Sequence, residues 1–442
     1  MNFDRLRALL FQQAMRGQLV PQFDEEKSVN IMPIVTSDVP HELPRKWVWV
    51  RSDEILEFIR GVTFPASAKR SALSEGIVRC LTTGSVQKRH NLAADVFVPS
   101  TYVKKDRQYL KKNDVVISSA NSKELVGKSI IWKGGEPRVS FGGFLTVARV
   151  KKDEINPIFV YYFFQFLFES RYFANLSTQT TNIANLSNAL LSSVLFPLPP
   201  IEEQERIVAK LEEAFAEIDR AEKAYEELQT LAGVLRGQIL QEAIQGKLVP
   251  QMAEEGVVEQ IGVAPDERPF EIPKSWKWRA LDEIFKFVDY RGKTPTKTTD
   301  GVRLITASNV RQGYVDHKRI EFISSEEYID RQNRGISKKG DILFTTEAPL
   351  GNVALADLDV YSAGQRVITL QTASENKKLL MYFMLSPYFQ KALKNNATGT
   401  TAQGIKAARL KKLMLPVPPV EEQARIASKV EELLKQVDAL SA

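Results

Sequence analysis

Apolar residues recur every seven positions along residues 201–249, in two series offset by four. Such a and d positions, kept for about five heptads, predict a long helix that pairs in a coiled coil, although a single core helix would carry a similar pattern. Pro199 and Pro200 precede the helix, and Gly246 and Pro250 mark its end. The seam residues that we expect to be buried are Ile207, Leu211, Ile218, Leu228 and Leu235 of this helix, and Ile426 and Leu433 near the C-terminus.

Three framing segments occur twice along the chain, in the same order. Each set has a helical segment that ends in Leu-Val-Pro-Gln, a Pro-x-x-Trp-x-Trp motif and a Pro-Pro-x-Glu-Glu-Gln motif. Agreement in three separate places excludes chance and indicates an internal duplication. The paired segments are 6–26 with 235–255, 42–49 with 271–278, and 195–207 with 413–426.

The duplication has a circular phase. The C-terminal helix copies the first half of the central helix, and the N-terminal helix copies its second half. The simplest packing therefore sets the central helix antiparallel to both terminal helices, about a pseudo-two-fold axis, so that the apolar seams bury one another.

Two blocks with mixed α/β signals lie between the helices, at 42–200 and 271–419. Matching strands are expected at 114–118 and 341–345, and at 78–82 and 302–306; helices are expected at 157–169 and 377–385. The two Trp-x-Trp pairs alternate as strand residues do and belong to the core or frame. The fold class is α+β: two mixed α/β domains separated by long antiparallel coiled-coil helices.

Charge is unevenly distributed. Residues 42–200 hold 22 basic and 13 acidic side chains, and residues 271–419 hold 24 and 15, so each block has a net charge of +9. Residues 201–249 hold 6 basic and 11 acidic side chains, a net charge of −5. Basic blocks on an acidic helix favour a polyanion partner, although an ordinary basic surface would give the same numbers.

The chain of 442 residues has one cysteine, Cys80, which fits a reducing compartment. Its longest apolar run, 157–168, is shorter than the ~18–20 residues that span a bilayer, and the N-terminus resembles an amphipathic segment, not a signal peptide. We therefore expect a cytoplasmic protein with no membrane partner.

Signs of catalysis are few. Gly127-Lys128-Ser129 and Gly292-Lys293-Thr294 lack the earlier glycine of a phosphate loop, and the three histidines are widely separated. We expect no catalytic residue, no metal and no cofactor on this chain, while an enzyme built from paired carboxylates stays open.

Polar, basic loops recur at corresponding places in the two blocks. Asn, Gln and Arg can pair with base edges, and Lys and Arg also hold phosphate, although each loop alone would pass for a solvated turn. We expect Arg89 or Gln87, and Asn309 or Arg311, to contact DNA. The full candidate set is Arg60, Gln87, Lys88, Arg89, Asn91, Asn121, Lys123 and Lys128 in the first block, and Arg291, Lys293, Asn309, Arg311 and Lys406 in the second.

The framing motifs resemble those of the specificity (S) subunits of type I restriction-modification enzymes, over essentially the whole chain. The resemblance rests on Leu-Pro-x-x-Trp-x-Trp at 43–49, the proline-rich segments 197–204 and 416–423, and Leu-Val-Pro-Gln after each helix. It implies an N-terminal helix at 1–22, target-recognition domains at 23–200 and 250–419, a central helix at 201–249 and a C-terminal helix at 420–442.

The resemblance further implies that each domain reads one half of a bipartite, asymmetric double-stranded DNA site, while the helices dock two modification (methyltransferase) subunits. Those subunits would carry S-adenosylmethionine and methylate adenine, and restriction-translocase subunits would bring ATP and Mg²⁺. This chain would be non-catalytic. Two other interpretations stay open: a coiled-coil scaffold that binds only protein, and a fused restriction-modification enzyme with its own catalytic site.

Overall fold

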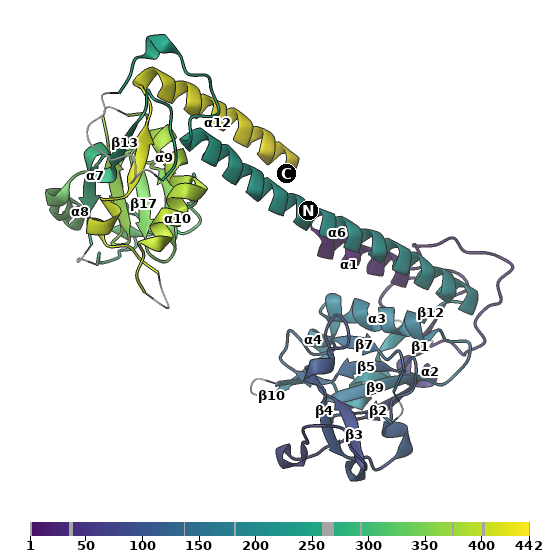
Figure 1. Cartoon of the computed structure of the whole chain (residues 1–442). Helices are drawn as coiled ribbons and strands as arrows, with labels where there is room; N and C mark the ends of the chain where they lie inside the picture. Colours follow the sequence, from purple (N-terminus) through teal and green to yellow (C-terminus); the bar gives the residue numbers. More distant parts are fainter. Residues whose placement is uncertain are drawn as a thin grey trace. The chain divides into compact units, whose positions relative to one another are not determined.

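The computed structural model describes residues 2–34, 39–136, 138–180, 183–258, 269–291, 294–373, 375–399 and 403–441. The chain folds into two compact units, unit 1 (Met1–Lys223) and unit 2 (Ala224–Ala442). The 44-residue helix α6 (Ile201–Ile244) gives its first half to unit 1 and its second half to unit 2 (Figure 1).

Unit 1 is built on a four-stranded antiparallel sheet of order β2-β9-β5-β7 and a three-stranded sheet of order β4-β3-β8, in which β3 and β8 run parallel. A short β1–β12 pair and a β10-β11-β6 sheet complete it. The strands are β1 (Val48–Arg51), β2 (Leu56–Arg60), β3 (Ile77–Leu81), β4 (Val96–Pro99), β5 (Val115–Ser118), β6 (Ala120–Asn121), β7 (Ser129–Ile131), β8 (Ser140–Phe141), β9 (Leu145–Val150), β10 (Thr178–Thr180), β11 (Ile183–Asn185) and β12 (Leu195–Leu198). The helices are α1 (Phe3–Met15), α2 (Ser52–Ile55), α3 (Pro157–Glu169), α4 (Tyr172–Leu176) and α5 (Asn188–Ser193).

Unit 2 repeats this strand order. Its four-stranded sheet has the order β14-β20-β17-β18, its three-stranded sheet β16-β15-β19 again contains one parallel pair, and β13 pairs with β21. The strands are β13 (Lys277–Ala280), β14 (Lys286–Asp289), β15 (Val302–Ile305), β16 (Phe322–Ile323), β17 (Ile342–Thr346), β18 (Leu350–Leu355), β19 (Ser362–Ala363), β20 (Val367–Gln371) and β21 (Met414–Val417). The helices are α7 (Leu281–Ile284), α8 (Ser325–Arg331), α9 (Lys377–Leu385), α10 (Pro387–Asn395), α11 (Ala407–Leu410) and α12 (Val420–Ser441).

The predicted strands and the helices within the two blocks are confirmed, whereas the helices expected at 1–22 and 201–249 end earlier, at Met15 and Ile244. Helices α3 and α9 have the expected bounds, and β5, β17, β3 and β15 lie at the expected strands, within a residue. Each helix starts after an asparagine (Asn156 or Asn376) whose side-chain oxygen accepts backbone N–H bonds of the first turn. The apolar faces of α3 and α9 form part of the main core of their units.

Each unit contains an antiparallel helix pair, as the repeat predicts. In unit 1, Arg7 of α1 lies 2.7 Å from both Asp219 and Glu222 of α6, and the rings of Phe11 and Phe215 lie 5.0 Å apart. In unit 2, α12 runs antiparallel to the second half of α6. Its last turn contacts α6 through a hydrogen bond from the Gln229 amide to the Ser441 carbonyl and an ion pair between Arg236 and Asp438. The α+β class with long antiparallel helices is therefore confirmed.

The named seam residues are buried or half-buried as expected, except for Leu228 and Leu235 in the second half of α6. Ile207, Leu211 and Ile426 are fully buried, and Ile218 and Leu433 are half-buried. Leu228 and Leu235, however, are 37% and 40% exposed. One partner helix covers only the row of side chains that faces it, here Ala232 and Ile239, and leaves the neighbouring row uncovered.

A buried carboxylate joins the framing motifs in each unit. In unit 1, Glu203 accepts hydrogen bonds from the Trp47 indole (2.9 Å) and the Gln22 amide (3.2 Å). In unit 2, Glu422 accepts the same two bonds from Trp276 (2.8 Å) and Gln251 (2.7 Å). The repeated motifs therefore form, in each unit, one polar junction between the mixed α/β block and the start of a helix. All four tryptophans of the paired motifs are buried and belong to the frame, as predicted: Trp47, Trp49, Trp276 and Trp278.

Within the described ranges, none of the helices combines the length and the apolar character that a membrane span requires.

Candidate nucleic-acid interface

In unit 1, several loops meet where the strands end, and we call this region the first corner (residues 60–63, 82–91, 119–121 and 142–145). Backbone hydrogen bonds hold the loops together: Gly61 N–H to Leu145 O (3.1 Å), Gly142 N–H to Leu81 O (2.8 Å) and Ser119 N–H to Phe144 O (3.0 Å). Gly61 has to be glycine, because a Cβ atom there would lie 2.2 Å from the carbonyl oxygen of Gly142. The Arg60-Gly61 segment is thus a close backbone crossing.

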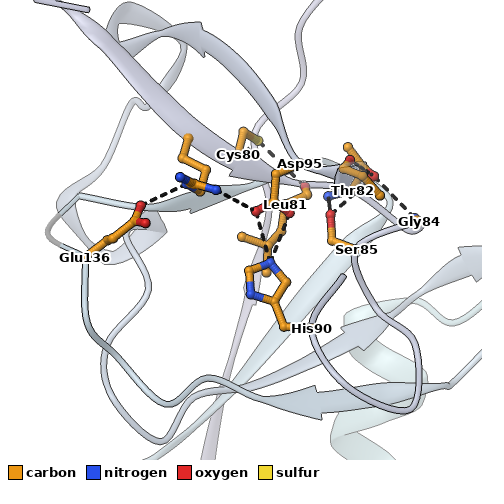
Figure 2. A network of polar contacts seen from close by, with 10 residues as sticks. Cys80, Leu81, Thr82, Gly84, Ser85, His90, Asp95 and Glu136 are labelled. Atoms are coloured by element: carbon orange, nitrogen blue, oxygen red, sulfur yellow. Dashed lines mark hydrogen bonds and ion pairs between the residues drawn. The ribbon is translucent and has the colours of Figure 1, made fainter. Parts of the chain in front are cut away.

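The loop 82–91 is braced at its base (Figure 2). The Ser85 hydroxyl accepts the Thr82 N–H at 2.8 Å, and the Thr82 hydroxyl donates to the carbonyl of Ala94 at 3.0 Å. The imidazole Nε2 of His90 lies 3.0 Å from both oxygens of Asp95. Asp95 is almost fully buried, and Arg79 reaches it from β3 at 3.4 Å. These contacts fix both ends of the loop.

The braced loop carries the predicted side chains at its tip. Gln87, Lys88, Arg89 and Asn91 are all exposed. Gln87 donates to the carbonyl of Gly84 at 3.2 Å, so it is the most restrained of the four. This arrangement suits contact with a polyanion, because the backbone is fixed while two amides and two cationic side chains are exposed to solvent.

Unit 2 contains an equivalent region, the second corner (residues 291, 306–314, 346–347 and 364–367). Gly364 N–H donates to Ile305 O (2.8 Å) and Thr346 N–H to Arg366 O (3.0 Å), as Gly142 and Ser119 do in unit 1. The two corners are therefore the same construction, made from the same places in two repeats.

Of the pair Asn309 or Arg311, expected to contact DNA, the choice of Asn309 is wrong. Its side chain is fully buried, and its oxygen accepts the backbone N–H (3.0 Å) and hydroxyl (2.9 Å) of Thr306. Its nitrogen donates to the carbonyls of Asp316 (2.9 Å) and Arg319 (2.8 Å). Asn309 thus occupies the place of Ser85 and closes the base of the loop.

The tip of the second loop is formed by residues 311–314. Arg311 is half-buried, and its guanidinium lies 3.5 Å from the Asp316 carboxylate. Gln312 and Tyr314, which the sequence interpretation did not include, are exposed, Tyr314 by 59%. Gln312 and Tyr314 lie two and four residues after the buried Val310, and only the tertiary structure shows that they are exposed.

The other predicted residues of the first block differ in availability. Arg60 and Lys123 are exposed. Asn121 donates to the Ser118 hydroxyl (3.0 Å) and accepts from the Ser122 N–H (2.9 Å), so its amide is partly used. Lys128 is half-buried, and burial lowers the pKa of its amine.

In the second block, Arg291 forms a two-point ion pair with Asp289 and donates to the carbonyl of Ile405 (3.3 Å). Burial opposes ionisation of Asp289, but the bonds from Arg291 hold the pKa of its carboxyl below the ordinary value. Most of the hydrogen-bond donors of the Arg291 guanidinium are therefore already used within the protein. Lys406 is exposed, and Lys293 lies outside the described residues.

In the part of the chain that the structure describes, no group of three or more His, Cys, Asp or Glu side chains could hold a metal ion. The two corners thus offer hydrogen-bond donors, acceptors and positive charge, which suit binding of a charged polymer.

Comparison with known proteins gives matches over most of the chain. A family model for the type I restriction modification DNA specificity domain matches residues 44–230 and 273–441. The specificity subunit of the type I restriction enzyme EcoKI from Escherichia coli (strain K12) is 26% identical over 414 residues, which cover 90% of this chain and 84% of that protein. The specificity subunit of MjaVIII from Methanocaldococcus jannaschii is 25% identical and covers 90% and 87%, respectively.

Solved structures share the fold. A chain described under complex assembly and conformational transition of the type I R-M system has a TM-score of 0.66 and 19% identity, covering 91% of this chain and 93% of that one. The HsdS subunit from Thermoanaerobacter tengcongensis has a TM-score of 0.54 and 19% identity, covering 92% and 93%.

Proposed function

Because the chain belongs to the family of type I restriction-modification DNA specificity subunits, we propose that each unit reads one half of a bipartite, asymmetric double-stranded DNA site. The observation that carries the proposal is the corner built twice on one scaffold. The backbone bonds are equivalent, while the exposed tips differ: Gln87-Lys88-Arg89 in one and Arg311 to Tyr314 in the other. Equal frames with unequal tips suit two readers of two different half-sites.

We further propose that the exposed apolar row of α6 docks the modification subunits. The row holds four residues that are 37–65% exposed: Leu228, Leu231, Val234 and Leu235. Leu6 and Leu9 of α1 are exposed as well. A helix pair that leaves such a row uncovered can add further helices and become a bundle. S-adenosylmethionine, ATP and Mg²⁺ would then be bound by the modification and restriction-translocase subunits.

We also propose that α6 sets the length of the unread spacer between the half-sites. It is one continuous helix, and each recognition block is tied to a helix start by the Glu203 or Glu422 junction. Four residues inserted between Lys223 and Ala224 would lengthen α6 by about 6 Å. We expect a spacer longer by about two base pairs at 3.4 Å each, with both half-sites unchanged. An unchanged spacer with full activity would exclude this role.

DNA reading is tested by sequencing methylated adenines in cells that express the chain with its modification subunits. We expect one asymmetric, two-part sequence. A salt titration of duplex binding by the purified complex should show affinity falling steeply with salt, because phosphate contacts release counterions. Absence of salt-sensitive duplex binding, with the modification subunits present, would favour the scaffold that binds only protein.

Docking is tested by Leu231→Asp with Val234→Asp, which place two charges in the exposed row without touching the core. We expect the modification subunits no longer to co-purify. Gln238→Asp, on an exposed polar side chain of the same helix, is the matched control and should assemble normally. Normal assembly of the double variant would refute this docking surface.

A further inference from the structure

A tight turn enters β9 in unit 1 and places Phe144 at the first corner. The Leu145 N–H donates to the carbonyl of Gly142 at 2.8 Å, which closes the turn. The carbonyl of Phe144 accepts three bonds, from the N–H (3.0 Å) and hydroxyl (3.2 Å) of Ser119 and from the N–H of Ala120 (3.2 Å). The Phe144 backbone is therefore fixed, while its side chain is 62% exposed.

The same turn enters β20 in unit 2. The Val367 N–H donates to the carbonyl of Gly364 at 3.0 Å, and the carbonyl of Arg366 accepts the N–H (3.0 Å) and hydroxyl (3.3 Å) of Thr346. Arg366 thus occupies the backbone place that Phe144 occupies in unit 1.

A second pair of places corresponds beside these residues. Ala120 pairs with Asn185 in β6–β11, and Glu347 pairs with Gly404 in the equivalent bridge. Glu347 lies 2.9 Å from the Arg366 guanidinium, and the two side chains are 45% and 50% exposed. One corner therefore presents an exposed apolar ring, and the other presents an oriented guanidinium.

We propose that this turn position determines one base pair of each half-site: Phe144 selects an A·T pair through the thymine methyl group, and Arg366 selects a G·C pair through the guanine edge. The inference rests on the proposed function, because it assumes that each corner faces DNA.

The chemistry of the major groove supports this assignment. Thymine is the base that presents a methyl group there, and an aromatic side chain can contact it. Guanine presents two acceptors that match a guanidinium in a bidentate pair. The ion pair with Glu347 orients the Arg366 head, and the pinned backbone reduces the entropy lost on binding at both places.

The test exchanges the two pairs of residues between the corners. Ala120→Glu with Phe144→Arg copies the unit 2 pair into unit 1, and Glu347→Ala with Arg366→Phe makes the reverse exchange. Methylated adenines are then sequenced in cells that carry each variant with the modification subunits. We expect the first variant to change one position of one half-site from A·T to G·C, and the second variant to change one position of the other half-site from G·C to A·T.

Single substitutions measure the size of the effect. We expect Phe144→Ala and Arg366→Ala each to lower discrimination at one base pair by about 10- to 100-fold, in competition binding to duplexes that differ at single positions. Leu73→Ala is the matched control, because Leu73 is 58% exposed in unit 1 but lies outside the first corner. It should keep the wild-type sequence preference.

The possible failures are distinguishable. A wild-type methylation sequence in Phe144→Ala and Arg366→Ala would overturn this inference and leave the proposed function intact. Equal weakening on every duplex would also overturn it, because the residues would then be non-specific contacts. Absence of any sequence-selective methylation by the wild-type complex would instead remove the proposed function, and this inference with it.

Discussion

In unit 1 the loop after β3 is closed by the hydroxyl of Ser85, which accepts the Thr82 N–H. In unit 2 the amide oxygen of Asn309 accepts the equivalent N–H of Thr306 after β15, and its nitrogen donates two further bonds, to the carbonyls of Asp316 and Arg319. The exposed side chains of the loop tips above them differ at corresponding positions: one tip carries Gln87, Lys88 and Arg89, and the other carries Gln312 and Tyr314. The two units therefore have equivalent backbone contacts, whereas the side chains that close the loop and those exposed at its tip differ.

The largest effect is expected from exchanging a whole recognition block. Replacing residues 42–200 by the block of another family member should change one methylated half-site completely and leave the other as it is. Several mismatched base pairs at about 1–3 kcal/mol each amount to more than a thousandfold discrimination. Methylome sequencing checks the result; a change in both halves would show that the units do not read independently.

The two loop braces should differ in their contribution to stability. Asn309→Ala removes both acceptor and donor contacts and leaves buried groups unpaired, at about 1–3 kcal/mol. Ser85→Ala removes a single neutral acceptor and should cost about 1 kcal/mol. Urea unfolding measures both. If Asn309→Ala changed the recognised bases while leaving stability untouched, the structural role assigned to Asn309 would be wrong.

The loop tips should act on one half-site each. We expect Arg89→Ala to weaken recognition of one half and Arg311→Ala that of the other, by about 1–3 kcal/mol where the side chain reads a base. Duplexes altered in a single half separate the effects. A uniform loss on all sequences would identify a phosphate contact, and unchanged affinity in both variants would exclude the tips from the interface.

The smallest effect concerns pH. Burial raises the pKa of Glu203 above its ordinary value of 4.5, despite the bonds from Trp47 and Gln22 that favour the carboxylate. The folded state therefore holds this proton to higher pH than the unfolded state, so the stability contributed by the group falls as pH rises from 4.5 through the raised pKa.

Glu203→Gln keeps an acceptor for Trp47 but cannot ionise. We expect it to flatten this part of the stability curve and to change neutral-pH stability by less than about 1 kcal/mol. Glu202→Gln, at the exposed neighbouring position, is the control. Thermal unfolding from pH 4.5 to 7 measures both, and identical slopes for Glu203→Gln and wild type would contradict the assigned protonation. Glu422→Gln should behave alike in unit 2, since burial raises the pKa of Glu422 too.

Much of the frame follows from sequence because its signals are local or duplicated. The heptads predict α6, apolar periodicity predicts α3 and α9, and the repeated motifs predict two equal frames. These features depend on neighbours within a few residues, or on comparison of the chain with itself.

Only the tertiary structure determines which polar side chains are exposed and able to contact DNA. Asn309 has the same side chain whether it closes a turn or reads a base, and only the carbonyls of Asp316 and Arg319 around it determine which. Leu228 and Leu235 fit the heptads as well as Ile207 does, but burial depends on how many helices surround them. Phe144 carries no local signal either, because its exposure follows from strands that meet only in the folded chain.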